Sequence, residues 1–200
     1  MTVAKSRPLA PAPALGRLVA AAFLIAAAAR CSGISNPSAT YDTVTYNSAL
    51  YALNGTPVGA ATAINTATAA TVRADAAYDF DVAFDLDASG TPVVMTQRVV
   101  GVPQGSSGHQ VSLLPLAGAF ASVVELPSGG WVADSSLTLR VGQVLGVRAG
   151  ASTCLAFASP YMYSKMMVDS VNIATRQLWV TTVTDPNCGF RGVGPGRPTS

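Results

Sequence analysis

The chain has 200 residues, of which half are hydrophobic and 11% are charged, with 18 glycines and 13 prolines. This composition excludes a disordered polyelectrolyte, a coiled coil and a collagen-like repeat, which need high charge or strict periodicity. The formal net charge is +2, but the residues from 31 onward carry a net charge of −2, with arginines scattered among the acids. Without a clustered basic stripe, we expect no nucleic-acid partner.

The first thirty residues predict export. Lys5, Arg7 and Arg17 precede an uncharged apolar run at 18–29. A permanent membrane span needs about 20 apolar residues, so this run is short for one. A basic start, a short apolar stretch and small residues after it are typical of a secretory signal peptide. The sequence therefore predicts a cleaved signal helix over residues 1–30.

Two endings of this signal peptide are open. The alanines at 27–29 permit cleavage before Arg30 and simple secretion into the periplasm or beyond. Alternatively, Cys31 directly follows the apolar run and precedes a stretch rich in Ser, Pro and Thr. This placement resembles a bacterial lipoprotein, although Arg30 stands where that class has a small residue. The resemblance implies a lipid on Cys31, a polar tether over 31–40 and anchoring in the inner or outer membrane.

From Tyr41 onward, short β-type runs are broken by turn residues every 8–12 positions, and no window has a helical period. This pattern predicts an all-β fold, an antiparallel β-sandwich of Ig-like or jelly-roll-like type, over residues 41–188. Asn54-Gly55 predicts a hairpin turn, and 60–74 is either a strand or an ordered loop. Residues 189–200 lack periodicity and predict a flexible tail. The other expected strands are 48–53, 78–86, 92–100, 110–114, 119–126, 131–133, 137–141, 144–149, 161–171 and 176–184.

The run at 78–86 alternates most clearly. Tyr78, Phe80, Val82, Phe84 and Leu86 fall on one face, and aspartates occupy the other face at positions 79, 81, 85 and 87. Neighbouring carboxylates on such a face lie about 6.5–7 Å apart, which is within reach of glycosidase chemistry. A hydrolase working through these aspartates is therefore one hypothesis, and a solvated acidic face is the other.

The segment at 85–90 matches the first half of a calcium-binding loop. Asp85, Asp87 and Ser89 stand at ligand positions 1, 3 and 5 before a glycine, and Asp81 could supply a further oxygen. Position 12 is Thr96 instead of glutamate, so an EF-hand is excluded. The alternative is a plain turn, in which Asp and Ser bind nearby backbone amides. Calcium is thus a possible cofactor, and no other cofactor is expected.

The three cysteines suggest one pairing. Cys154 and Cys188 both lie in the folded body, and an oxidising compartment favours a disulfide between them, which leaves Cys31 over. His109 is the only histidine, so a site with several imidazoles is excluded within one chain. His109 lies in a Gly/Ser-rich loop, where it is expected to be exposed and not catalytic.

The two tryptophans are candidate ligand-binding residues. Trp131 follows a glycine-rich turn, and Trp179 shares a strand face with polar residues, where each could stack on a sugar or anchor a protein. The alternative is that other parts of the fold cover them. Arginine outnumbers lysine ten to two, as is typical of GC-rich bacterial genomes.

Together these features predict an exported bacterial envelope or surface protein, a lipoprotein that acts as a non-catalytic binding or structural module. Its partner would be an envelope protein or a glycan, and it would meet the membrane only through the N-terminal lipid. The alternatives are a calcium-assisted carbohydrate-binding β-sandwich and the aspartate hydrolase.

Overall fold

The computed structural model describes residues 38–75, 79–102, 110–155 and 159–199. The predicted signal peptide, the Cys31 lipid site, Tyr78 and His109 lie outside the described residues. No helix within the described ranges is long and apolar enough to cross a membrane.

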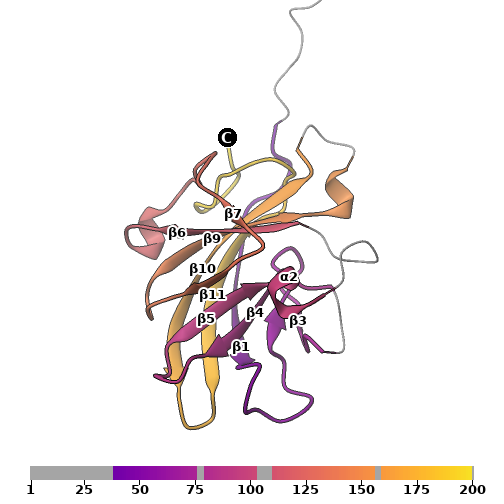
Figure 1. The fold of residues 1–200 in the computed structure, drawn as a ribbon. Coiled ribbons are helices and arrows are strands. Elements are labelled where there is room, and N and C mark those ends of the chain that lie inside the picture. Colours follow the sequence, from indigo (N-terminus) through magenta and orange to yellow (C-terminus); the bar gives the residue numbers. More distant parts are fainter. Residues whose placement is uncertain (1–37, 76–78, 103–109, 156–158, 200) are drawn as a thin grey trace, which may run out of the picture. The chain divides into compact units, whose positions relative to one another are not determined.

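The described chain forms two antiparallel sheets, which confirms the expected all-β sandwich (Figure 1). The six-stranded sheet has the order β1 (Val44–Tyr51), β11 (Gln177–Asp185), β10 (Tyr161–Asn172), β9 (Val144–Gly150), β6 (Val111–Leu116), β7 (Val132–Ala133). The five-stranded sheet has the order β3 (Thr71–Val72), β2 (Ala63–Ile64), β4 (Val82–Leu86), β5 (Pro92–Thr96), β8 (Ser136–Thr138). Short helical turns are α2 (Gln97–Val100), η1 (Phe120–Ser122) and η2 (Ser152–Cys154).

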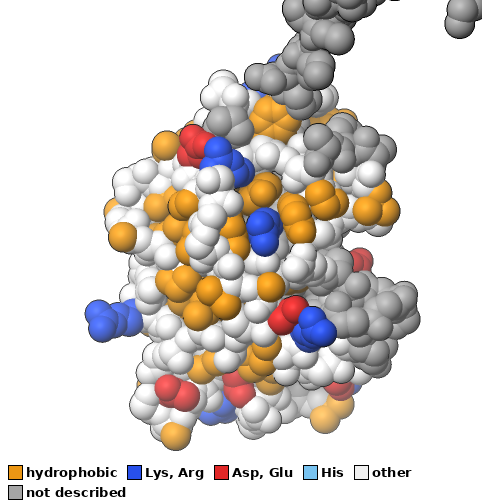
Figure 2. All heavy atoms as spheres, turned by 45° about the horizontal axis from the view of Figure 1, so that its top comes forward, with side chains coloured by type: hydrophobic (Ala, Val, Ile, Leu, Met, Phe, Trp, Pro, Cys, Tyr) orange, Lys and Arg blue, Asp and Glu red, His pale blue; other side chains and the backbone are white. Residues whose placement is uncertain are grey.

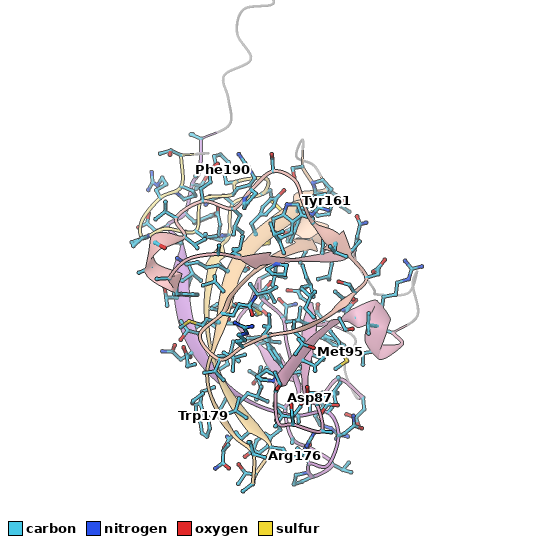
Figure 3. All side chains as sticks on the ribbon, turned by 60° about the vertical axis from the view of Figure 1, so that its left-hand side comes forward. Asp87, Met95, Tyr161, Arg176, Trp179 and Phe190 are labelled. Carbon is cyan, nitrogen blue, oxygen red and sulfur yellow. A yellow bond between two sulfur atoms is a disulfide. The ribbon has the colours of Figure 1, made fainter. Side chains whose placement is uncertain are left out.

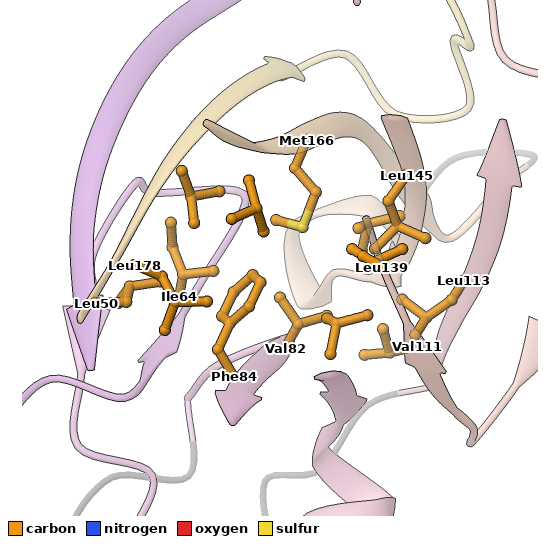
Figure 4. Close-up of a cluster of buried hydrophobic side chains, with 14 of the residues drawn as sticks. Leu50, Ile64, Val82, Phe84, Val111, Leu113, Leu139, Leu145, Met166 and Leu178 are labelled. Carbon is orange, nitrogen blue, oxygen red and sulfur yellow. The ribbon is translucent and has the colours of Figure 1, made fainter. Parts of the chain in front are cut away.

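The core lies between the two sheets, where alternate residues of each strand meet (Figure 4). Leu50, Leu145 and Leu178 of the larger sheet pack in the same buried cluster as Val82 and Phe84 of the smaller one. Each of these side chains is fully buried. Burial of such a side chain stabilises the fold by roughly 1.5–3 kcal/mol relative to exposure. The period of two in the sequence therefore defines which face of each strand looks inward.

The segment before β4 departs from the predicted alternation. Phe80 lies in a second buried cluster with Ala83, not in the main cluster with Val82 and Phe84. The chain bends at Asp81, which moves Phe80 to the opposite face. Asp81 itself is only 1% exposed, because its carboxylate accepts hydrogen bonds from the backbone and hydroxyl of Thr66. The expectation of a regular solvated acidic face is therefore wrong at Asp81.

Three predicted local elements are also corrected. The chain bends at Asn54-Gly55, with Gly55 at φ +70°, but the ladder of β1 is with β11, and the Tyr51 amide alone of β1 donates to the segment after the bend, at Ala61. The run at 92–100 ends as a strand at Thr96 and continues as α2, which Gly101 terminates at φ +97°. The run at 119–126 contains η1 instead of a strand, and the Lys165 ammonium donates to the carbonyl groups of Phe120 and Val123.

The segment at 189–199, expected to be a flexible tail, makes specific contacts with the rest of the fold. Val193 is fully buried, and its amide donates to the carbonyl of Val124. Thr43, which precedes β1, donates its amide to Gly196 and its hydroxyl to Gly194. These bonds let a glycine-rich segment without periodicity join the fold.

Both ends of the expected domain are fastened near Asn187. The amides of Thr40 and Tyr41 donate to its side-chain oxygen at 2.7 and 2.9 Å. The last residues of the expected tether therefore already belong to the folded body. The predicted Cys154–Cys188 disulfide is confirmed, with the two Cα atoms 5.4 Å apart. It joins the turn after β9 to the segment after β11.

Candidate binding surface

The outer face of the six-stranded sheet is partly covered and partly open. At the end that bears Tyr163 of β10, a third hydrophobic cluster containing Leu126, Val183 and Val193 covers it. At the other end, near the turn between β10 and β11, the outward side chains stay at the surface. We call this open part the Trp179 strip; it consists of Asn47, Ala49, Asp169, Trp179 and Thr181.

The strip combines an exposed aromatic ring with hydrogen-bonding groups. Trp179 is 38% exposed, and its ladder neighbours Ala49 and Ser170 are too small to cover an indole ring. The Thr181 hydroxyl lies 2.8 Å from Asn47 Oδ1 and 2.8 Å from Asp169 Oδ2. Because one hydroxyl donates to one acceptor at a time, these oxygens keep spare capacity. A ligand can therefore meet a flat apolar ring and several polar atoms on one rigid face.

Trp131 is partly buried and packs against the third hydrophobic cluster. Its ring makes an edge contact with Tyr163, with 5.8 Å between centroids, and its Nε1 donates to the carbonyl of Pro127 at 3.0 Å. It also lies close over Gly146, where a Cβ atom would be 3.2 Å from the indole ring. The glycine in β9 is what admits the indole to this position.

Arg148 stacks on Trp131 and Tyr161, contacts that the sequence did not predict. Its guanidinium lies 5.4 Å from the Trp131 ring centroid and 4.7 Å from that of Tyr161, and Nη2 donates to Ser112 Oγ. Its Nε is buried without a hydrogen-bond partner among the described residues. Stacking of this kind stabilises a desolvated arginine without a carboxylate. The available signal was a single charge within the apolar run at 144–149.

The two predicted tryptophans do not form one site. Tyr163, which touches Trp131, pairs with Asp185, and Asp185 is six residues along β11 from Trp179. At about 3.4 Å per residue, the two aromatic groups are about 20 Å apart. Figure 3 shows Tyr161 and Trp179 at opposite ends of the sheet.

The candidate calcium ligands are not gathered either. Asp85 pairs with Arg176 of the β10–β11 turn at 3.0 Å and also accepts from Asn54. Asp87 accepts from the backbone and hydroxyl of Ser89, and these bonds hold the pKa of its carboxyl below the usual value.

Asp81 is buried against Thr66, away from solvent. The described part of the chain contains no group of three or more His, Cys, Asp or Glu side chains suited to a metal ion. The segment at 87–91 is thus built as a self-bonded turn. Of the aspartates proposed for hydrolysis, Asp79 is exposed and accepts from Asn65, while its neighbour Asp81 is enclosed.

Asp185 is a perturbed carboxyl that the sequence did not reveal. Burial raises its pKa from 3.8 to about 6, against the lowering effect of hydrogen bonds from Asn187. Its Oδ1 accepts from the backbone and the side chain of Asn187, whereas its buried Oδ2 has no hydrogen-bond partner among the described residues. Because Asn187 also holds Thr40 and Tyr41, Asp185 supports the place where the chain enters the fold.

Charge is dispersed over the described surface. On the face shown in Figure 2, hydrophobic side chains alternate with isolated charged ones, without a continuous basic band. No family model, curated protein or solved structure matches this chain. A functional proposal must therefore rest on the sequence and on the surface geometry.

Proposed function

We propose that this chain is an exported, non-catalytic binding module of the bacterial cell envelope, tethered through Cys31, which binds a glycan on the Trp179 strip. The observation that carries the proposal is the 38% exposure of Trp179 on the sheet face beside three hydrogen-bonding side chains. The finer assignment of the sandwich as Ig-like or jelly-roll-like, and the cleaved signal helix, stay predictions.

The chemistry of a sugar suits this arrangement. A pyranose has an apolar C–H face that packs on an indole ring, while its hydroxyls need donors and acceptors at the ring edge. Asn47, Asp169 and Thr181 supply such groups, and Thr181 already ties the other two together. Because the strip lies on a hydrogen-bonded sheet, little side-chain freedom is lost on binding, which favours affinity.

The proposal uses no calcium and no catalytic aspartate. The carboxylate of Asp85 is engaged by Arg176, and that of Asp87 by its own turn. Calcium-assisted binding stays an alternative prediction. It requires a calcium ion to replace Arg176 as the partner of the Asp85 carboxylate. Thermal unfolding with and without millimolar calcium distinguishes the two, because a bound ion stabilises the native state.

Titration calorimetry against soluble envelope glycans tests the proposal. The full chain should bind at least one glycan, Trp179→Ala should abolish the heat, and Trp179→Phe should retain weaker binding. Trp131→Phe is the matched control, because that ring faces Tyr163 and lies about 20 Å away. Equal binding by the wild type and Trp179→Ala would refute the assignment of the strip.

The tether is tested separately. The intact mass of the protein purified from its own host should correspond to a chain that begins at Cys31 and carries acyl groups. A chain that begins at Arg30 or Ser32 without added mass would instead show simple secretion.

A further inference from the structure

The four edges of the two sheets are unequal. Three edge strands are very short: β3 and β7 have two residues each and β8 has three. Short edge strands are one of the ordinary ways in which a sheet protein avoids pairing with other chains. The fourth edge strand, β1, has eight residues.

β1 also lacks the other protective devices. Its sequence, Val-Thr-Tyr-Asn-Ser-Ala-Leu-Tyr, contains no charge, no proline and no glycine, and its pairing with β11 runs without a bulge. Lysine, proline and bulges are what edge strands elsewhere use to prevent association. The fold therefore blunts three edges and leaves one suited to pairing.

The direction of the free hydrogen-bonding groups follows from the alternation along β1. Ala52 donates its amide to Arg176 on the β11 side, whereas Thr43 and Tyr51 donate to Gly196 and Ala61 on the outer side. Since successive residues alternate, the backbone N–H and C=O groups of the odd-numbered residues of β1 point away from β11.

Between the two occupied positions, Thr45, Asn47 and Ala49 are exposed. Their outward amides and carbonyls have no hydrogen-bond partner among the described residues. A free window of three ladder positions thus remains on this edge.

This window is symmetrical about one residue. Asn47 lies at its centre, and the occupied residues Thr43 and Tyr51 bound it at four positions on either side. We propose that this edge pairs antiparallel with the same edge of a second copy of the chain, with Asn47 of both copies at the two-fold axis. The contact is isologous and closes after two copies.

In this register every free group of the window finds a partner. Asn47 faces Asn47 of the other copy, and Thr45 faces its Ala49 on both sides of the axis. Each is a hydrogen-bonded pair that exchanges two N–H···O bonds. The side chains of the paired residues Thr45, Asn47 and Ala49 are small and uncharged, so no like charges meet across the pair. A window of three positions is a small contact, so the dimer forms in a concentration-dependent way.

Sedimentation velocity of the full chain from about 1 µM to about 1 mM tests the pairing. The wild type should shift from one copy to two. Asn47→Pro removes the outward amide at the axis and should weaken association more than about tenfold. Asn47→Ala keeps that amide and should weaken it no more than about fivefold, the most that one cross-strand side-chain pair contributes.

Asn47→Lys places two ammonium groups face to face and keeps the backbone amide. This variant should be monomeric at low salt, and it should dimerise again at high salt, where the repulsion between the ammonium groups is screened. Val132→Lys is the matched control, since it adds the same charge at the opposite edge of the same sheet. This variant should dimerise like the wild type.

Cross-linking tests the register. In a Cys31→Ser background, Asn47→Cys should form an intermolecular disulfide, because the paired Cα atoms are about 5.5 Å apart. Thr45→Cys faces Ala49 of the other copy and should not. A wild type that stays a monomer throughout, a dimer that survives both Asn47→Pro and Asn47→Lys, or cross-linking at Thr45 alone would each overturn the proposal. Binding of an extended peptide to the β1 edge of a chain that stays monomeric would also overturn the proposal.

Discussion

The buried carboxyl of Asp185 makes the stability of this protein depend on pH in an unusual direction. Its pKa is about 6 in the folded chain and 3.8 as the ordinary value. The folded state therefore binds the proton more tightly, and unfolding releases it between these two pH values. The stabilising effect is fully present below about pH 4 and is lost as pH rises through about 6. The difference corresponds to roughly 3 kcal/mol.

Urea unfolding of the wild type and Asp185→Asn at several pH values measures this effect. The variant has no charge to bury, and its amide oxygen can still accept from Asn187. The free energy of unfolding of the variant minus that of the wild type should rise by roughly 3 kcal/mol from pH 4 to pH 7.5. Asp75→Asn is the control: the pKa of that exposed carboxyl is lowered by Arg73, so removal of its charge should have a small effect of opposite sign. A difference between Asp185→Asn and the wild type that is the same at every pH would refute the reasoning.

Three further changes test the packing and the covalent link. Phe84→Ala leaves a cavity between the sheets and should cost about 3–5 kcal/mol in urea unfolding; a cost below 1 kcal/mol would contradict the packing. Reduction of Cys154–Cys188 should cost roughly 3–4 kcal/mol, because it releases a loop with a sequence separation of 34; unchanged unfolding would show that the bond is not formed. Gly90→Ala forces alanine to φ +80° and should cost about 1–2 kcal/mol by thermal unfolding, whereas Gly129→Ala should be nearly neutral.

The sequence pattern predicted best the strands that pair with a neighbour in the chain. The hairpin expected at 161–171 and 176–184 matches β10 and β11 closely, because both runs and the turn between them are adjacent in the chain. The strand expected at 144–149 matches β9, whose residues are nearly all buried, as a short apolar run between turn residues predicts.

Features that depend on distant parts of the chain could not be read from the sequence. β1 pairs with β11, more than a hundred residues away, so the Asn54-Gly55 turn suggested the wrong neighbour. Residues 189–199 are ordered by backbone bonds to Val124 and Thr43, which leave no periodic trace. Asp185 ends a strand and precedes Pro186, so its sequence resembles an exposed turn, although tertiary packing encloses it.

For the candidate site, the sequence identified Trp179 as an outward residue but not its surroundings. Asn47 and Asp169 come from β1 and β10, and only the pairing of both strands with β11 brings them to Thr181. The four predicted calcium ligands are close in sequence, yet the chain bends at Asp81 and Asp85 is engaged by Arg176 of the β10–β11 turn. Proximity along the chain did not predict this outcome, because Thr66 and Arg176, which engage Asp81 and Asp85, are distant in the sequence.

The fastening of Thr43 to Gly194 and Gly196 has a consequence for orientation. The segments before β1 and after β11 lie at the same end of these strands. The turn between β10 and β11, next to Trp179, lies at the other end. Under the tether proposed above, a pull on the chain before residue 38 would therefore act on the end that holds Thr43, and the exposed Trp179 lies toward the other end.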